Sequence, residues 1–274
     1  MENENINDFK KSMEQEDKRV VKLPALDFFK INIISFLVPL YVCLGLFLLF
    51  EYGLIDLVLG FDNVLHIIIL PGFLFLLYYI YLILIIEFTA LWTRRWNKKY
   101  PPEQGVFARV LDDPNSPEGK MIKYYHKRGF IIKLPMWLTS KSPFPWLVNR
   151  TLRRVGHNKI GKNVIYCNSY VGLEFTDLGD NVFFYPTSGL SSHEVNTIFG
   201  KITMMEIKIS KNTTFYPGDI MGPNALTTEN NVIFPNTVLH KNWRGKPNEF
   251  YYQGSPGRPI EIKHLKKEGN KFIF

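Results

Sequence analysis

The sequence predicts a membrane α plus all-β protein, in which a two-helix transmembrane hairpin is followed by a parallel β-helix. Three observations predict this fold class. Two almost purely apolar stretches, 31–50 and 64–86, lie in the first third of the 274 residues. A short phrase ending in Asn and a small or β-branched residue recurs from Ile160 onward. In the same region, a mostly apolar residue recurs at every sixth position from Ile209 to Leu239.

The two apolar stretches predict the transmembrane hairpin at 31–93. The first is twenty residues without a charge, and the second is twenty-three residues without Asp, Glu, Lys or Arg. Each matches the roughly 20 residues that a helix needs to cross a bilayer. A buried core helix or a cleaved signal peptide fits poorly, because the first stretch starts about thirty residues in and the second follows at once.

Lys and Arg lie on one side of both predicted spans. Basic residues precede the first span, four follow the second within 94–99, and the connecting loop 51–62 has none. Because basic flanks stay on the cytoplasmic side, we expect a multi-pass protein of the cell membrane with both termini cytoplasmic. Trp92 and Trp96 fit the inner membrane interface. The residues at 1–30 are then a cytoplasmic N-terminal arm, and those at 263–274 are a basic tail.

Charge and cysteine content exclude some classes of function. The net charge is +8, but no nucleic-acid recognition motif accompanies it, so membrane lipid is the expected partner and nucleic acid is not. The two cysteines are Cys43, inside the first span, and Cys167, inside the repeats. A disulfide is therefore implausible, and no metal-ligand spacing exists.

The residues at 94–155 are predicted to be a linker with amphipathic helices. A short strand is expected at 106–111, and a second short helix at 144–154. Residues 118–133 alternate apolar and basic positions, as a basic amphipathic helix does. Such a helix fits either the membrane interface or the surface of the soluble domain.

The residues at 156–262 are predicted to form the β-helix. A step of six is typical of a prism whose sides are single hexapeptides, each with one inward residue. Gly or Asn is expected at the corners, where the backbone needs unusual angles. An irregular β-sandwich is the alternative. The inward series is Ile209, Phe215, Met221, Thr227, Ile233 and Leu239, with Thr227 its one polar member.

One interruption breaks the repeat. The phrases that begin at Ile160 and Leu178 are 18 residues apart, but the next begins at Ile209, 31 residues further on. Thirteen residues are therefore inserted. The inserted part contains His193, so we expect a histidine-bearing loop that leaves the prism.

These motifs resemble the left-handed β-helix hexapeptide-repeat acyltransferase family over roughly 150–262. The likeness is carried by Ile160-Gly-Lys-Asn-Val164, Leu178-Gly-Asp-Asn-Val182 and the closing Gln253-Gly-Ser-Pro-Gly-Arg-Pro259. It implies left-handed coils and a homotrimer with sites between adjacent prisms. It also implies acyl-CoA or acetyl-CoA as co-substrate, with no tightly bound cofactor.

The chain also resembles the membrane-bound C-terminal units of polylysine-synthetase-type nonribosomal peptide synthetases, which are understood to alternate transmembrane helices with such β-helices. The segments that carry this likeness are 153–161, 177–180, the Ser-His-Glu at 192–194, and 239–241. This chain has one β-helix unit and no adenylation or carrier domain. A separately encoded carrier or adenylation protein is the partner that this likeness implies.

Acyl transfer from a thioester needs a general base and donors for an oxyanion. His193 is the candidate base, because it lies in the insertion where the family places its catalytic histidine. Glu194 beside it, or Glu174, is expected to orient the ring, and backbone N–H groups around Gly189 or Gly222 are candidate oxyanion donors. A surface-loop histidine without a catalytic role is the alternative for His193.

Further candidates follow the later coils. Lys241 and Arg244 suit an anionic group such as a coenzyme A phosphate, although a solvated charge cluster has the same pattern. Arg258, in the closing phrase, is assigned by resemblance to the pantetheine region. Substrate-binding candidates are Ser192, His240 and Trp243, and His240 is also the second candidate base.

The function predicted from these features is a membrane-anchored acyltransferase that acts on an amine or hydroxyl acceptor at the cytoplasmic face. Two alternatives stay open. One is a non-catalytic trimeric β-helix scaffold. The other is a condensing or acceptor-binding unit that works with a separate carrier protein.

Overall fold

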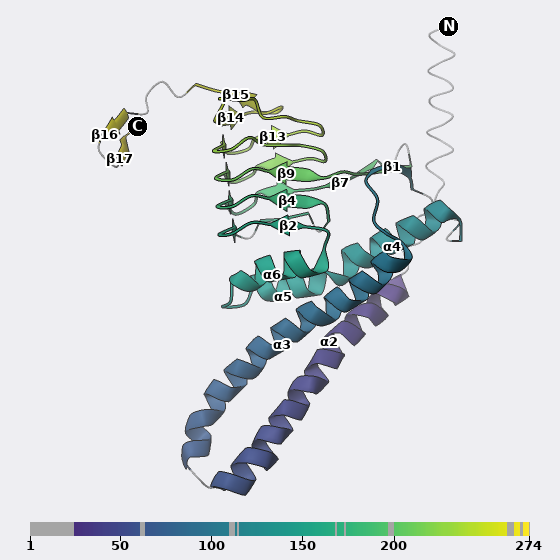
Figure 1. The fold of residues 1–274 in the computed structure, drawn as a ribbon, viewed down its shortest axis with the longest axis vertical. Helices are drawn as coiled ribbons and strands as arrows, with labels where there is room; N and C mark the ends of the chain where they lie inside the picture. The colour runs from purple at the N-terminus through teal and green to yellow at the C-terminus, as the bar shows by residue number, and fades with distance from the viewer. Residues whose placement is uncertain are drawn as a thin grey trace. The chain divides into compact units, whose positions relative to one another are not determined.

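A computed structural model describes residues 25–60, 64–109, 113, 115–167, 169–172, 174–196, 200–261, 266–268 and 271–273. The chain forms two compact units (Figure 1). Of the described residues, those within Lys18–Pro102 and Val110–Gly156 form the helical unit, and those within Glu103–Arg109 and His157–Phe274 form the β-helix unit. The predicted arm up to residue 24 and the start of the predicted tail lie outside the described residues. The short segment at 103–109 joins the β-helix unit, although the sequence placed it in the linker.

Two long helices dominate the helical unit. Helix α2 spans Ala25–Leu48 and continues as the π-helix η1 over Leu49–Leu59, and α3 spans Val64–Lys99. By length and composition, Ala25–Val58 and Val64–Lys99 are both able to cross a bilayer. The loop was expected to start at residue 51, and this start is wrong. Helical turns continue until Gly60, whose φ of 75° ends them.

Polar and aromatic contacts join the two helices near this turn. Glu51 of η1 pairs with His66 of α3 at 3.2 Å, and Phe50 stacks on Phe73 with ring centroids 3.8 Å apart. His66, the one histidine in the predicted spans, therefore has a structural partner.

Three shorter helices complete this unit: α4 (Pro117–Ile131), α5 (Lys133–Ser140) and α6 (Trp146–Val155). Helices α4 and α6 confirm the two predicted amphipathic helices. Ser116 caps α4 by accepting the N–H of Gly119 at 3.0 Å. Arg150 and Arg154, from the polar face of α6, both bind the carboxylate of Glu87 on α3.

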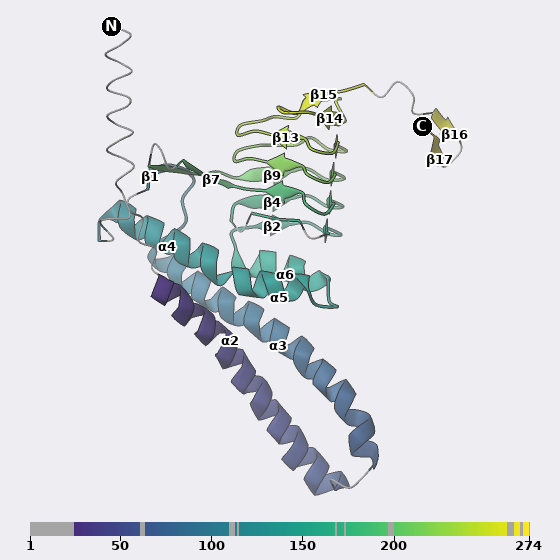
Figure 2. The ribbon, with the colours of Figure 1, turned by 180° about the vertical axis from the view of Figure 1, so that it is seen from behind.

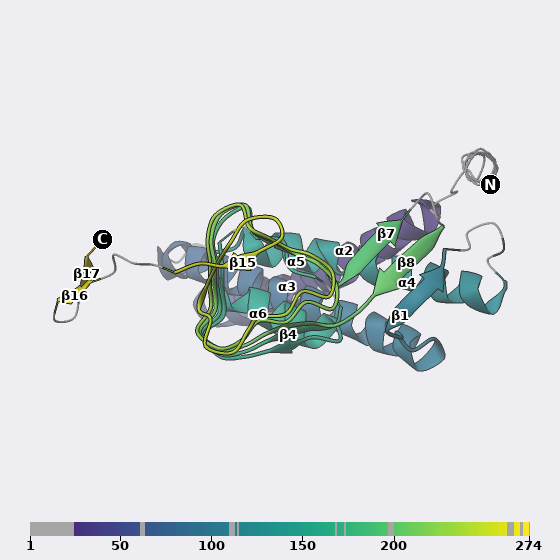
Figure 3. The same cartoon turned by 90° about the horizontal axis from the view of Figure 1, so that it is seen from above.

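The β-helix unit confirms the predicted coils. Parallel strands stack in three sheets, one for each side of the prism (Figures 1 and 3). Ile160 pairs with Leu178, and Lys208 with Leu226, so one coil takes 18 residues. The first sheet contains β2 (Lys159–Ile160), β4 (Thr176–Leu178) and β9 (Ile207–Ile209). The second contains β3 (Ile165–Tyr166), β5 (Phe183–Phe184), β10 (Thr214–Phe215), β12 (Val232–Ile233), β14 (Tyr251–Gln253) and antiparallel β15 (Arg258–Pro259), and the third contains β6 (Gly189–Leu190), β11 (Ile220–Met221) and β13 (Val238–Leu239).

The predicted inward series forms the core of the prism. All six members, from Ile209 through Leu239, are buried. The polar member, Thr227, accepts the N–H of Ser210 with its hydroxyl at 2.9 Å. This pairing satisfies a polar group that burial would otherwise leave without a partner. The irregular β-sandwich is excluded, whereas the hand of the coils stays a prediction.

Asparagines occupy the corners, as predicted. Those with a positive φ, between 54° and 66°, are Asn163, Asn181, Asn212, Asn224, Asn230, Asn236, Asn242 and Asn248. Along one corner, the side-chain amides of Asn163, Asn181, Asn212 and Asn230 hydrogen-bond in series at 2.9–3.1 Å. The left-handed backbone and the amide ladder both favour Asn at these positions.

The interruption is a β-hairpin that leaves the prism (Figures 2 and 3). Its strands are β7 (His193–Asn196) and β8 (Lys201–Met204), and β8 also pairs with β1 (Gly105–Ala108). Leu178 pairs with Ile209 across the insertion, so the coil resumes in register. The predicted loop is thus a three-stranded antiparallel sheet, to which 106–111 contributes in part.

Candidate functional site

His193 lies where the hairpin leaves the coil, and its partner is Glu174. Nε2 of His193 is 3.8 Å from Oε2 of Glu174, with side-chain exposures of 16% and 5%. The carboxylate therefore lies within ion-pair distance of the imidazole. The pair resembles, in its chemistry, a general base with an orienting acid.

Two serine hydroxyls bind the backbone of this pair, one from the next coil and one from the same segment. The Ser192 hydroxyl donates to the backbone carbonyl of Glu174, and the hydroxyl of Ser191 donates to that of His193. At Gly172, a Cβ would lie 3.2 Å from the Ser192 hydroxyl oxygen, so glycine permits this close approach. Ser192 is buried and acts here by holding Glu174 in place.

Phe175 adds an unusual backbone conformation to the site. Its φ is 54°, which a bulky side chain rarely adopts and which is often retained at functional sites. The ring lies between two histidines: it stacks with His157 at 6.2 Å and meets His193 edge-on at 6.4 Å. This conformation places the Phe175 ring against His193 while Glu174 faces the imidazole.

Glu194, the first carboxylate assigned to His193, faces another group of residues. Successive side chains on a strand point to opposite faces, so Glu194 turns away from the side of His193. Of the two carboxylates expected to orient the ring, Glu174 is therefore the one that faces it. Glu194 instead lines a groove of about 310 Å³ together with Val106, Asn196, Lys201, Thr203 and Lys241.

Lys241, from a later coil, contacts the hairpin. Its Nζ donates to the hydroxyl of Thr203 at 2.9 Å, and Thr203 is the cross-strand partner of Glu194. The groove thus combines two lysines with a carboxylate and a hydroxyl. Lys241 and Glu194 were candidates from the sequence, whereas Lys201 and Thr203 were not. Only the hairpin register places Thr203 opposite Glu194 and Lys201 opposite Asn196.

The other candidates bond to neighbouring coils. His240 is exposed, with Nε2 3.2 Å from the Ser255 hydroxyl, and Trp243 donates to the Gly257 carbonyl at 2.8 Å. Arg244 donates to both the backbone and side-chain oxygens of Asn224. These hydrogen bonds give His240, Trp243 and Arg244 structural partners. Arg258 is exposed, in the strand β15 that pairs with the end of β14.

The two glycines considered for the oxyanion already use their N–H groups. Gly189 donates to the Asp219 carbonyl at 2.7 Å, and Gly222 donates to the Leu239 carbonyl at 2.8 Å. The N–H groups of other residues around them stay candidates for an oxyanion, whereas neither glycine N–H is available to a substrate. The reason is that each glycine belongs to a ladder between coils.

Asp219 is a buried acid that the sequence did not single out. Burial raises the pKa of its carboxyl to about 7, although the N–H groups of Thr237 and Tyr216, which donate to it at 2.9 and 2.7 Å, act in the opposite direction. Its place at a corner, with both oxygens bound by backbone, identifies it as part of the scaffold. Within the described ranges, no group of three or more His, Cys, Asp or Glu side chains is placed to hold a metal ion.

Known proteins resemble this chain in structure, whereas no family model and no curated protein matches its sequence. Similar solved structures include a maltose O-acetyltransferase from Clostridium difficile 630, at 20% identity and a TM-score of 0.37. They also include a hexapeptide-repeat acetyltransferase from Vibrio cholerae O1 biovar eltor in complex with acetyl coenzyme A (13%, 0.37) and a galactoside acetyltransferase in complex with coenzyme A (12%, 0.34). These matches cover 50%, 54% and 54% of this chain, and 86%, 91% and 89% of the matched chains.

Proposed function

We propose that the β-helix unit transfers an acyl group from a coenzyme A thioester to an amine or hydroxyl acceptor, with His193 as the general base. The observation that carries this proposal is the pair of His193 and Glu174, 3.8 Å apart and largely buried at the base of the hairpin. A largely buried histidine beside a buried carboxylate, next to a residue with a strained backbone, is a common arrangement in active sites.

The proposed step is a direct transfer. His193 takes the proton as the acceptor oxygen or nitrogen bonds to the thioester carbonyl carbon. The tetrahedral intermediate then collapses, the C–S bond breaks, and the leaving thiolate accepts the proton from His193. Glu174 stabilises the imidazolium that forms in between.

The groove beside the hairpin is the proposed binding region. Lys201 and Lys241 supply positive charge for the phosphates of a coenzyme A thioester. Glu194 and Thr203, on the same surface, are placed to accept and donate hydrogen bonds to an acceptor. Arg258 is exposed and remains a proposed contact for the donor.

We also propose that the helical unit anchors the enzyme in the cell membrane with both termini cytoplasmic. The support is the length and composition of the two helices and the apolar side chains that they expose. Among the most exposed are Leu49, Leu57, Val58, Ile67 and Ile68. The acceptor would then be a molecule that reaches the inner membrane face.

A homotrimer is the proposed assembly, supported by the second sheet of the prism. Tyr185, Tyr216 and Phe234 stack along this side, with ring centroids 4.9 and 6.0 Å apart. Ile165, on its first coil, is half exposed. A row of aromatic rings on the outside of a prism is well suited to packing against another copy.

The test is transfer of acetyl from acetyl-CoA to a panel of amines and alcohols by purified protein, followed by release of free thiol. His193→Ala should lower kcat by about 10²–10⁴-fold, the usual contribution of a general base. His240→Ala, which removes an exposed histidine of a later coil, is the matched control and should retain activity. An unchanged rate in His193→Ala would remove this residue from the mechanism, and absence of thioester binding across several acyl-CoA compounds would favour the scaffold alternative.

A further inference from the structure

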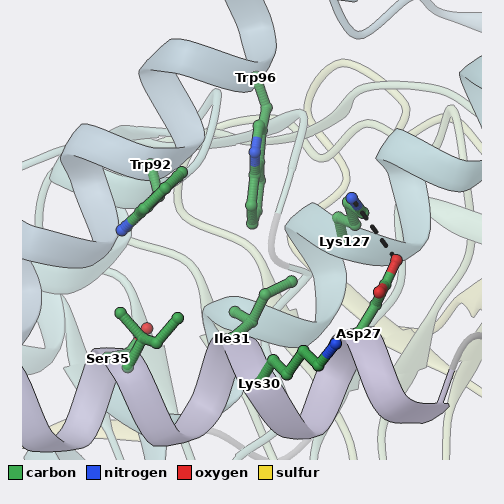
Figure 4. Close-up of a pocket in the computed structure, with 8 residues that line it drawn as sticks. Asp27, Lys30, Ile31, Ser35, Trp92, Trp96 and Lys127 are labelled. Carbon is green, nitrogen blue, oxygen red and sulfur yellow. Dashed lines mark ion pairs between the residues drawn. The ribbon is translucent and has the colours of Figure 1, made fainter.

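A pocket of about 190 Å³ lies in the helical unit, among α2, α3 and α4 (Figure 4). It is separate from the residues proposed for acyl transfer. Helix α2 contributes five residues on successive turns, α3 contributes two tryptophans, and α4 contributes one lysine. The lining residues are Asp27, Lys30, Ile31, Ile34, Ser35, Trp92, Trp96 and Lys127.

The rim of this pocket carries excess positive charge. Lys127 is 3.8 Å from the Asp27 carboxylate, near the limit for an ion pair. Lys30 is exposed and forms no ion pair with any residue that the structure describes. Two ammonium groups therefore share one carboxylate, which leaves one positive charge for a ligand.

Aromatic rings form the wall above this rim. The Lys127 ammonium is 6.0 Å from the Trp96 ring centroid, and the Arg95 guanidinium is 5.8 Å from that of Trp92. The two indole rings are 6.0 Å apart. Tryptophan rings next to basic side chains are typical of the level at which lipid headgroups lie.

Ser35 supplies a polar atom deeper in the pocket. Its side chain is 1% exposed, and its hydroxyl has no hydrogen-bond partner in the described part of the chain. A serine inside a helix ordinarily donates to a carbonyl one turn earlier, and a buried hydroxyl without a partner costs free energy. A ligand oxygen at this place would satisfy it.

We propose that this pocket binds the phosphate and glycerol portion of an anionic glycerophospholipid. Lys30 and Lys127 would hold the phosphate, and the Ser35 hydroxyl would donate to a glycerol or ester oxygen. The volume suits this portion and not a whole lipid. The acyl chains would continue over the exposed apolar surface of Ile34 and Leu91, 45% and 62% exposed. This proposal uses the membrane anchor but does not depend on acyl transfer.

The experiment is a titration of the full-length protein in detergent with brominated phosphatidylglycerol or brominated phosphatidylcholine, followed by tryptophan fluorescence. Two of the five tryptophans line the pocket, so occupancy should quench them. Quenching by phosphatidylglycerol should saturate, with a Kd at least tenfold lower than for phosphatidylcholine. Equal affinity for the two lipids would overturn the proposal.

Paired variants separate a site from diffuse attraction. The double variant Lys30→Gln, Lys127→Gln should lower the preference for phosphatidylglycerol over phosphatidylcholine at least tenfold. The double variant Lys98→Gln, Lys99→Gln removes the same charge from the exposed end of α3 and should change this preference less than twofold. Equal losses in both pairs would mean surface attraction only. Ser35→Leu should block quenching without a change in charge, and circular dichroism checks that the helices remain.

Two further arms identify the ligand and keep the proposals distinct. Inorganic phosphate should compete poorly, and competition as strong as that of the lipid would assign the pocket to free phosphate. His193→Ala should bind the lipid normally, so a failure of the proposed transferase activity leaves this result unaffected.

Discussion

Two buried acids of the β-helix unit differ in what surrounds them. Glu174 faces the imidazole of His193, whereas both oxygens of Asp219 accept backbone N–H groups of their own and the next coil. The first arrangement suits the proposed proton transfer, in which the charge of the partner changes. The second fixes the backbone at a corner and holds an acid in a dry environment.

The carboxyl of Asp219 should make stability depend on pH. With its pKa raised to about 7 in the folded protein and near 3.8 when exposed, the folded state retains a proton that the unfolded state loses. The free energy of unfolding should therefore fall as pH rises from about 4 to about 7, by up to about 4 kcal/mol. Denaturant unfolding of the protein at several pH values measures this slope, and Asp219→Asn should flatten it; an equal slope in the variant would contradict the assignment.

Glu174 should matter to catalysis and Glu194 should not act through His193. Glu174→Gln keeps the size of the side chain but removes the charge that stabilises the imidazolium, so we expect kcat to fall about 10- to 100-fold. Glu194→Gln, which changes the carboxylate next to His193 in the sequence, is the matched control. It should alter KM for the acceptor and leave kcat nearly unchanged. Steady-state kinetics of both variants separates these effects, and a larger loss of kcat in Glu194→Gln would reverse the two roles.

At the scale of elements, the corners explain how such short strands hold together. Each strand of two or three residues contributes few hydrogen bonds, so the turns between strands have to be specified as well. Asparagine does so twice, since its backbone tolerates the left-handed conformation and its amide bonds to the asparagine of the next coil. The corners thus stabilise the stack along its axis.

Asn212 tests both contributions, because it bonds to Asn181 on one side and to Asn230 on the other. Asn212→Gly keeps the positive φ but loses the amide bonds, and should cost about 1–2 kcal/mol. Asn212→Ala loses the bonds and also strains the backbone, for a further cost of about 1 kcal/mol. Thermal unfolding should rank the wild type above Gly and Gly above Ala, and a more stable Ala variant would show that φ is not limiting.

Repetition decides which elements the sequence predicts well. The inward series from Ile209 to Leu239 was predictable because each coil places its members in the same environment. The coil length also predicts that Glu174 lies beside the insertion. Ser192 follows Glu174 by 18 residues, the length of one coil, and binds its carbonyl. The end of η1 was not predictable from charge, because acidic residues at 51 and 56 looked like a loop while the backbone stayed helical until Gly60.

At the scale of the whole molecule, the two units differ in where their apolar side chains lie. The helical unit exposes apolar side chains over long helices, and the β-helix unit encloses its own core. The acceptor does not follow from this sequence, because it is a separate molecule.

The aromatic row of the second sheet makes the proposed trimer testable. Tyr216→Glu places a charge between Tyr185 and Phe234, and should dissociate the assembly. Ile220→Glu, an exposed apolar residue on the third sheet, is the matched control and should leave it intact. Detergent-corrected mass measurement reads out both, and a monomeric wild-type protein would end the trimer proposal.

The constant coil length has a consequence for the groove. Coils stack about 4.8 Å apart, and Lys241 follows β13, two steps along the third sheet from β6, which leads into the hairpin. The number of stacked coils therefore sets the distance between the hairpin and Lys241 along the axis of the prism. Removal of one 18-residue coil between them would shorten this distance by one coil spacing, and every remaining coil would keep neighbours of the same kind. The chain thus contains a way to change the spacing of its cations without changing its fold.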